Sequence, residues 1–176
     1  MKKEKIYIFD LDHTIFNAKE FKKDLQKILG FENSDDLSEK IWKVHKESPE
    51  KIENILKNDL EKYLFKNIKE EILKLDGEII LLTWGDFNFQ KTKVQSLGLD
   101  KVFDRVYFTA ENKIHFLEDF LNYHQDKEIC FINDNYNKRL NENKAIAEKL
   151  SEIKVFEVDN YENTEKSILN ILKKLQ

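Results

Sequence analysis

Five short runs of apolar residues divide the chain, and most of their members are β-branched or aromatic. Each run is almost continuous, whereas a strand with one solvated face would alternate apolar and polar residues. Continuous runs of this length are typical of strands buried on both faces of a parallel sheet. The expected strands are Ile6–Phe9, Ile79–Leu82, Val106–Phe108, Ile129–Ile132 and Val155–Val158.

Segments with helical periodicity separate the strands from the second run onward. Apolar side chains recur every three or four residues in the stretches Ile114–Leu121, Ile146–Leu150 and Ile168–Leu175. Alternation of strands and helices predicts right-handed crossover connections between parallel strands. We therefore expect an α/β fold, with a Rossmann-like, doubly wound parallel sheet of five strands.

The segment between the first two strands is much longer than one crossover requires. Its apolar pattern is helical, with Ser34 as an expected N-cap and Pro49 in the first turn of the third helix. The helices expected in it are Ala18–Leu29, Leu37–Val44 and Ser48–Leu64. A further helix, Ile68–Leu75, is expected to lead into the second strand. We thus expect an α/β core of residues 1–16 and 66–176, with a helical cap of residues 17–65 inserted after the first strand.

Composition and charge narrow the function classes. Of the 176 residues, 36% are charged and 40% hydrophobic, which is typical of a globular domain in water. The net charge is −4 and no continuous basic stripe is present, so we expect no nucleic-acid partner. We expect no membrane partner either, because no apolar run is long enough to cross a bilayer. The single cysteine, Cys130, allows no internal disulfide, and we expect a cytoplasmic protein.

Acidic and hydroxyl side chains directly follow three of the expected strands. Asp10 and Asp12 follow the first strand, Thr83 the second and Asp134 the fourth. Because ligands bind at the carboxyl ends of the strands in open α/β sheets, these side chains are expected to converge on one edge. A carboxylate can attack phosphorus, and a second one can transfer a proton. Carboxylates also suit Mg²⁺, which prefers oxygen ligands.

Four segments together resemble the motifs of the haloacid dehalogenase superfamily. They are IYIFDLDHT, with its Asp-x-Asp-x-Thr pattern, LLTWGD, ENKIHFL, with Lys113 near a helix start, and FINDN. They follow the family's order over the whole chain, and the helical insertion lies where the family has its cap. The resemblance implies a metal-dependent phosphatase that hydrolyses a small phosphorylated metabolite through an aspartyl-phosphate intermediate.

The resemblance also implies a role for each matched residue. Asp10 is the expected nucleophile and Asp12 the acid/base, while Thr83 and Lys113 complete the catalytic set by holding phosphate oxygens. Mg²⁺ is the expected cofactor, held by Asp10, Asp134 and the backbone carbonyl of Asp12. The expected substrate-binding residues are Thr83, Trp84, Gly85 and Lys113.

The chain departs from the family pattern at three places. His13 occupies a position where the family often has Gly, either as a turn residue or as a contact to substrate. Asn133 stands where many relatives have Asp or Gly, and Asn137–Arg139 contains no second acid after Asp134. We therefore expect weaker Mg²⁺ binding than in a relative with two acids there.

Other functions and other residues are compatible with the motifs. A phosphotransferase such as a phosphomutase would use the same aspartyl-phosphate with a different acceptor, and a non-catalytic binding module would keep only the fold. A dehalogenase is disfavoured, because Asp12 and Asp134 suit metal-assisted phosphoryl chemistry, whereas displacement at a carbon–halogen bond needs no metal. Lys91 or Lys93 is an alternative to Lys113 as the cation nearest the phosphate. The sequence does not specify an oligomeric state.

Overall fold

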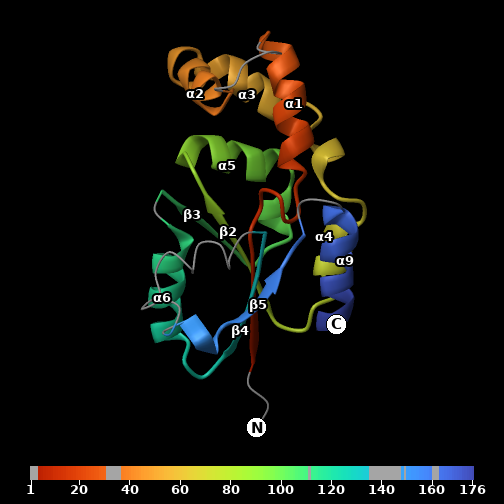
Figure 1. Cartoon of the computed structure of the whole chain (residues 1–176), viewed down its shortest axis with the longest axis vertical. Coiled ribbons are helices and arrows are strands. Elements are labelled where there is room, and N and C mark those ends of the chain that lie inside the picture. The colour runs from red at the N-terminus through yellow and green to blue at the C-terminus, as the bar shows by residue number, and fades with distance from the viewer. Residues whose placement is uncertain (1–3, 31–36, 111, 135–147, 149, 160–162) are drawn as a thin grey trace.

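The computed structural model describes residues 4–30, 37–110, 112–134, 148, 150–159 and 163–176. Five parallel strands form one sheet in the order β3-β2-β1-β4-β5 (Figure 1). The strands are β1 (Lys5–Phe9), β2 (Glu78–Trp84), β3 (Arg105–Thr109), β4 (Glu128–Asn133) and β5 (Lys154–Glu157). The predicted α/β fold with a parallel five-stranded sheet is confirmed, and β1 lies at its centre.

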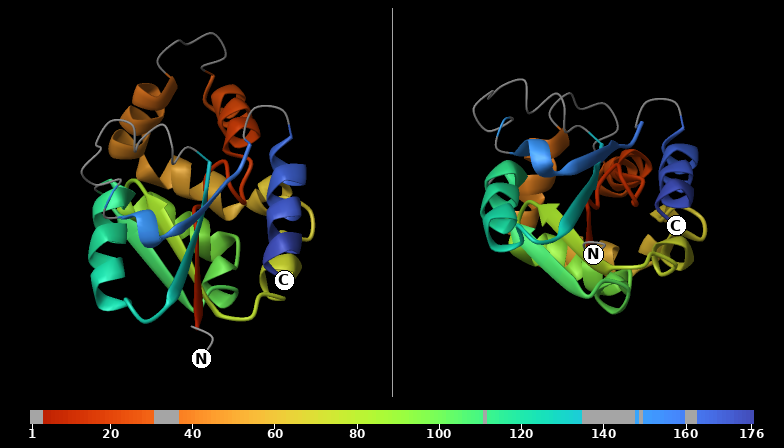
Figure 2. Two further views of the ribbon diagram at one scale, coloured as in Figure 1. Left: turned by 60° about the horizontal axis from the view of Figure 1, so that its bottom comes forward. Right: turned by 90° about the horizontal axis from the view of Figure 1, so that it is seen from below.

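Helices cover both faces of the sheet. The helices α4 (Ile68–Ile72), α5 (Phe87–Ser96) and α9 (Thr164–Leu175) pack on one face, and α6 (Lys113–Tyr123) packs on the other (Figure 2). Three short 3₁₀ helices lie in the described parts of the connections, η1 (Leu60–Tyr63), η2 (Leu99–Lys101) and η3 (Leu150–Glu152). No helix in these described parts of the chain is long and apolar enough to span a membrane.

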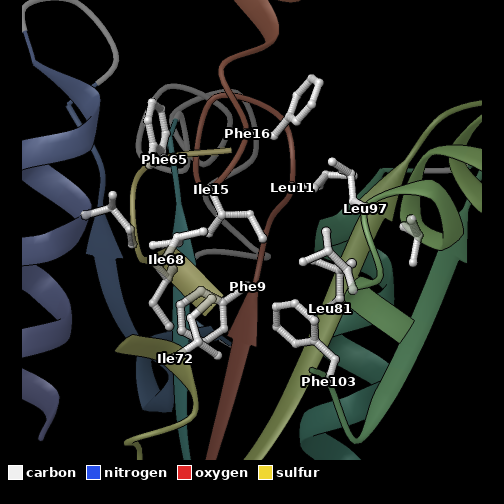
Figure 3. Packing of buried hydrophobic residues seen from close by; sticks show 14 of the residues in the cluster. Phe9, Leu11, Ile15, Phe16, Phe65, Ile68, Ile72, Leu81, Leu97 and Phe103 are labelled. Atoms are coloured by element: carbon white, nitrogen blue, oxygen red, sulfur yellow. The ribbon is translucent and has the colours of Figure 1, made fainter. Parts of the chain in front are cut away.

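Alternate residues of the strands belong to two hydrophobic clusters, one on each face of the sheet. Phe9 and Leu81 belong to the cluster under α4, α5 and α9, whereas Ile8 and Leu82 belong to the cluster under α6. Figure 3 shows the first cluster, in which the rings of Phe9 and Phe103 lie edge to face with centroids 5.9 Å apart. Burial of both strand faces explains why the strand sequences are continuously apolar.

Three more helices lie beyond the carboxyl end of β1, at the end of the molecule opposite the N-terminus (Figure 1). They are α1 (Ala18–Leu29), α2 (Leu37–Glu47) and α3 (Pro49–Lys57). The Asn17 side chain caps α1 by accepting from the Glu20 N–H, and Gly30 ends it with a φ of 73°. α3 packs against α5, so this end of the sheet is covered by helices from the segment between β1 and β2.

The third inserted helix is shorter than the apolar pattern predicts. The pattern indicates one helix from Ser48 to Leu64, but α3 ends at Lys57. Asn58 is extended and Asp59 is left-handed, with a φ of 55°, so the chain turns before η1 continues the apolar stripe. The apolar residues keep their helical spacing across this break, so the sequence pattern did not reveal the break.

Three other predictions about helices need correction or lie outside the described residues. The helix predicted for Ile68–Leu75 ends earlier, at Ile72. Ser34 and Ile146 are not among the described residues, and Leu150, predicted to continue a helix, lies in η3.

Two chain segments connect the inserted helices to the sheet, and they lie side by side. The Asn17 N–H donates to the Tyr63 carbonyl at 2.7 Å, and the Phe65 N–H donates to the Ile15 carbonyl at 3.3 Å. Phe16 forms a bridge with Leu64 between these bonds. The paired segments coincide with the boundaries expected for the cap, although the division of the chain into core and cap stays a prediction.

We expect Gly77→Ala to destabilise the fold, because a Cβ there would lie 2.6 Å from the Lys5 carbonyl oxygen and 3.0 Å from the Tyr7 ring. The loss of unfolding free energy should be about 2 kcal/mol, the usual range for overpacking. Gly30→Ala is the matched control: its Cβ meets open space, so only the left-handed backbone is strained, at about 1 kcal/mol. Urea unfolding measures both; equal losses would contradict the proposed clash.

Candidate active site

Asp10 lies at the carboxyl end of the central strand and is almost fully buried. Its backbone N–H donates to the Ile132 carbonyl of β4 at 2.9 Å, which extends the sheet by one residue beyond β1. Its Oδ1 accepts the Leu11 N–H at 2.6 Å. These bonds hold the buried carboxylate of Asp10 at the centre of the sheet edge.

A tight loop follows Asp10 and turns the chain toward α1. The Leu11 carbonyl accepts the N–H groups of Thr14, Ile15 and Phe16 at 3.1 to 3.3 Å. His13 has a φ of 62° and donates its N–H to the Phe16 carbonyl at 2.9 Å. The left-handed backbone at His13 explains why glycine would suit this position, and it supports the interpretation of His13 as a turn residue.

Lys113 forms an ion pair with Oδ1 of Asp10. It is the first residue of α6, which Asn112 caps by accepting the Ile114 N–H at 3.1 Å. The side chains of Lys113 and Asp10 are each 7% exposed, so the pair is buried. The lysine predicted from the third motif therefore lies beside the predicted nucleophile.

Lys93, whose side chain is buried, forms a second ion pair with Oδ1 of the partly exposed Asp12. Gln90 lies one turn earlier on α5, and its Nε2 is 3.3 Å from Oδ2 of Asp12. The Lys93 ammonium also lies 3.9 Å from the centroid of the Phe16 ring. The sequence analysis considered Lys93 only as an alternative phosphate ligand and did not identify Gln90, because both belong to a helix that matches no motif.

Burial and charge shift the pKa values of the two carboxyls in opposite directions. Burial raises the pKa of Asp10, which Lys113 lowers in part, and the charges of Asp12 and Asp134 add to the rise. Burial also acts to raise the pKa of Asp12, but the Lys93 ammonium and the Gln90 amide outweigh it, so the pKa falls below its usual value. Asp12 is therefore the carboxyl that ionises more readily.

The second motif lies beside β1, at the end of β2. Thr83 is 1% exposed. Trp84 is 51% exposed, and its Nε1 donates to the Ala110 carbonyl at 3.1 Å, which directs the indole toward the end of β3. Gly85 donates its N–H to the Thr109 carbonyl at 3.0 Å. Thr83 thus lies on the strand next to Asp10, whereas Trp84 and Gly85 contact β3.

The fourth motif lies on the other side of β1, at the end of β4. Asn133 and Asp134 are 3% and 9% exposed, and both are engaged in interactions within the protein. The charge of Asp134 raises the pKa of Asp10, which indicates that the two carboxyls are near each other. The stretch Asn137–Arg139 lies outside the described residues. Within those residues, no group of three acidic, His or Cys side chains is arranged to hold a metal ion.

A polar contact joins the inserted helices to the sheet-flanking helix α5. The His45 ring on α2 lies with its Nε2 3.2 Å from Oδ1 of Asp86. Asp86 is also the N-cap of α5 and accepts the Phe89 N–H at 2.9 Å. One carboxylate therefore caps the helix that carries Gln90 and Lys93 and also contacts α2.

We expect His13→Gly to be about 1 kcal/mol more stable than His13→Ala, because both remove the imidazole but only glycine relieves the left-handed backbone. Urea unfolding of the two variants tests this difference. If His13→Ala were as stable as His13→Gly, the backbone at this position would not be strained.

No protein-family model matches the chain, and no curated protein matches it. Solved structures do resemble it. A protein named as a haloacid dehalogenase-like hydrolase from Burkholderia xenovorans is 16% identical with a TM-score of 0.69, over 97% of this chain and 96% of that one. One named as a β-phosphoglucomutase from Thermotoga maritima is 15% identical with a TM-score of 0.59, over 100% of both chains.

A third similar structure is named as a phosphatase from Clostridium difficile. It is 18% identical with a TM-score of 0.52, over 98% of this chain and 100% of that one. Many of the similar structures are hydrolases of the haloacid dehalogenase superfamily. At these identities the likeness shows the fold alone. The chain has the fold of the haloacid dehalogenase-like hydrolases.

Proposed function

We propose that the chain is a magnesium-dependent phosphatase that hydrolyses a small phosphomonoester through an aspartyl-phosphate on Asp10. The observation that carries this proposal is the pair of carboxylates, Asp10 and Asp12, at the end of the central strand. Each is paired with a buried lysine, and Thr83 and Asp134 flank them on the neighbouring strands. The names of the structures with the same fold, among them a phosphatase, agree with this chemistry.

The proposed reaction has two steps. In the first, a carboxylate oxygen of Asp10 forms a bond to phosphorus as the ester P–O bond breaks, and Asp12 gives a proton to the leaving oxygen. In the second, Asp12 takes a proton from water, the water oxygen bonds to phosphorus, and the bond to Asp10 breaks. Lys113 and the Thr83 hydroxyl hold the non-bridging oxygens, where negative charge accumulates.

The residues at the site have the chemistry to hold Mg²⁺. Asp10 and Asp134 would provide carboxylate oxygens and Asp12 its backbone carbonyl, which are the hard ligands that this ion prefers. A bound cation would neutralise the carboxylates and the phosphate. The raised pKa of Asp10 fits such a site, because burial and the charge of Asp134 otherwise disfavour the ionised form that a nucleophile needs.

The inserted helices favour a small substrate. The helices α1–α3 lie beyond the carboxyl end of β1, and α3 packs on α5. The helix α5 carries Gln90 and Lys93, the two side chains that contact the Asp12 carboxylate. Helices over the site would exclude water and leave little room for a macromolecular substrate. We therefore propose that the substrate is a small phosphorylated metabolite. We also propose that the protein acts in the cytoplasm.

A phosphotransferase is the second candidate, favoured by the full-length likeness to the structure named as a β-phosphoglucomutase. Its first step would be the same, and a sugar or alcohol hydroxyl would replace water in the second step. Added glycerol or glucose would then divert the phosphoryl group. Formation of a new phosphate ester, in place of inorganic phosphate, would favour the transferase.

We expect Asp10→Asn to reduce phosphate release from a panel of phosphomonoesters by at least about 10³-fold, because the amide cannot form the covalent intermediate. Circular dichroism should show a folded protein. Asp100→Asn, an exposed acid in η2, is the matched control and should keep full activity. Acid-quenched wild type should contain a phosphorylated peptide that includes Asp10. Turnover retained in Asp10→Asn would overturn the assignment of the nucleophile.

We expect the activity to require Mg²⁺, and we expect Asp134 to contribute to binding of the ion. Chelation of metal should remove the activity, and added Mg²⁺ should restore it. In Asp134→Asn the Mg²⁺ concentration for half-maximal activity should rise by about tenfold or more, because a neutral amide replaces a charged ligand. Asp100→Asn again provides the comparison. An unchanged half-maximal concentration would exclude Asp134 as a ligand.

A further inference from the structure

We infer that Lys93 and Gln90 are positioning residues that orient the Asp12 carboxylate toward the leaving-group oxygen. This inference rests on the proposed function, since it assigns the support of the proposed acid/base. Neither residue belongs to the four motifs that resemble the superfamily. Both come from α5, the helix that follows the second motif.

The two donors occupy one face of α5 and reach different oxygens of the same carboxylate. Lys93 pairs with Oδ1, and Nε2 of Gln90 lies 3.3 Å from Oδ2. Their spacing of three residues puts both side chains on neighbouring turns of the helix. Two contacts on two oxygens restrain the rotation of a carboxylate, which a single contact would not do.

Both positioning side chains are themselves restrained. Lys93 is 2% exposed, and its ammonium lies 3.9 Å from the centre of the Phe16 ring and 5.7 Å from that of Phe21. The Gln90 amide also donates to the Trp84 carbonyl at 3.2 Å. A side chain at Gly85 would come within 3.2 Å of the same amide, so glycine leaves the room that Gln90 needs.

Stability alone does not account for a lysine at this position. A buried ammonium loses its hydration, and apolar side chains of similar volume often serve a core as well as or better than a buried ion pair does. The Asp12 side chain is 32% exposed, although its partner is enclosed. One side of the carboxylate is therefore held by α5 while another side is open, as a group that acts on a substrate requires.

Orientation of the acid/base affects only the part of the reaction in which a proton moves. An aryl phosphate with a good leaving group needs little protonation when its P–O bond breaks, whereas a poor leaving group needs it strongly. Loss of positioning should therefore reduce turnover in proportion to leaving-group basicity. A general weakening of the structure would instead reduce the turnover of all these esters alike.

The test measures kcat/KM with Mg²⁺ for a series of aryl phosphates, from 4-nitrophenyl to unsubstituted phenyl phosphate. We expect Lys93→Met to lose less than about fivefold with the nitrophenyl ester and about 10²-fold with the phenyl ester, with little change in KM. Lys101→Met, an exposed lysine of η2, is the control and should match the wild type.

Two further variants keep the test decisive if Lys93→Met does not fold. Gln90→Leu should show the same leaving-group dependence with a smaller loss, and Gln95→Leu, an exposed residue of the same helix, should show none. Lys93→Arg keeps the cation and should recover part of the loss with the phenyl ester. In an Asp12→Asn background, Lys93→Met should add no further leaving-group dependence.

The outcomes separate this inference from the proposed function. An active wild type in which Lys93→Met and Gln90→Leu lose nothing, or lose equally with every ester, overturns the positioning role and leaves the phosphatase intact. A wild type that hydrolyses none of the esters in the series, nor any in the metabolite panel, overturns both.

Discussion

Two carboxylates lie within three residues at the end of one buried strand, and their charges must be compensated where water is scarce. An unpaired buried charge is too costly to persist in its ionised form. The fold meets this constraint from both faces of the sheet: Lys113 reaches Asp10 from α6, and Lys93 reaches Asp12 from α5. The positions of both helices therefore matter to the central strand as much as its own hydrogen bonds do.

The parallel sheet is what makes this compensation possible. The central place of β1 puts β2 and β4 on either side of Asp10, and the helices that follow β2 and β3 pack on opposite faces. The left-handed turn at His13 then carries the chain away from the sheet. Asp12 lies at the start of this turn, which explains how it can contact α5 while Asp10, two residues earlier, contacts α6.

The sequence predicted the sheet well because burial on both faces leaves a simple, continuous apolar signature. The same runs locate the strand ends, so Asp10, Thr83 and Asp134 could be assigned to the ends of strands that the structure places side by side. The break at Asn58–Asp59 escaped prediction because a left-handed residue leaves no trace in an apolar period. Lys93 could not be chosen over Lys91 from the sequence, because its burial depends on the direction in which α5 packs.

The two ion pairs differ in what they do to the acids they neutralise. Lys113 does not fully offset the burial of Asp10, whose pKa stays raised, whereas Lys93 and Gln90 together bring the pKa of Asp12 below its usual value. Taken alone, these shifts are the reverse of what the proposed roles need, because the nucleophile Asp10 must be ionised and Asp12 must carry a proton in the first step. Asp10 is the carboxyl that needs further positive charge. A cation bound by Asp10 and Asp134 would meet that need, which is why the fourth motif matters as much as the first.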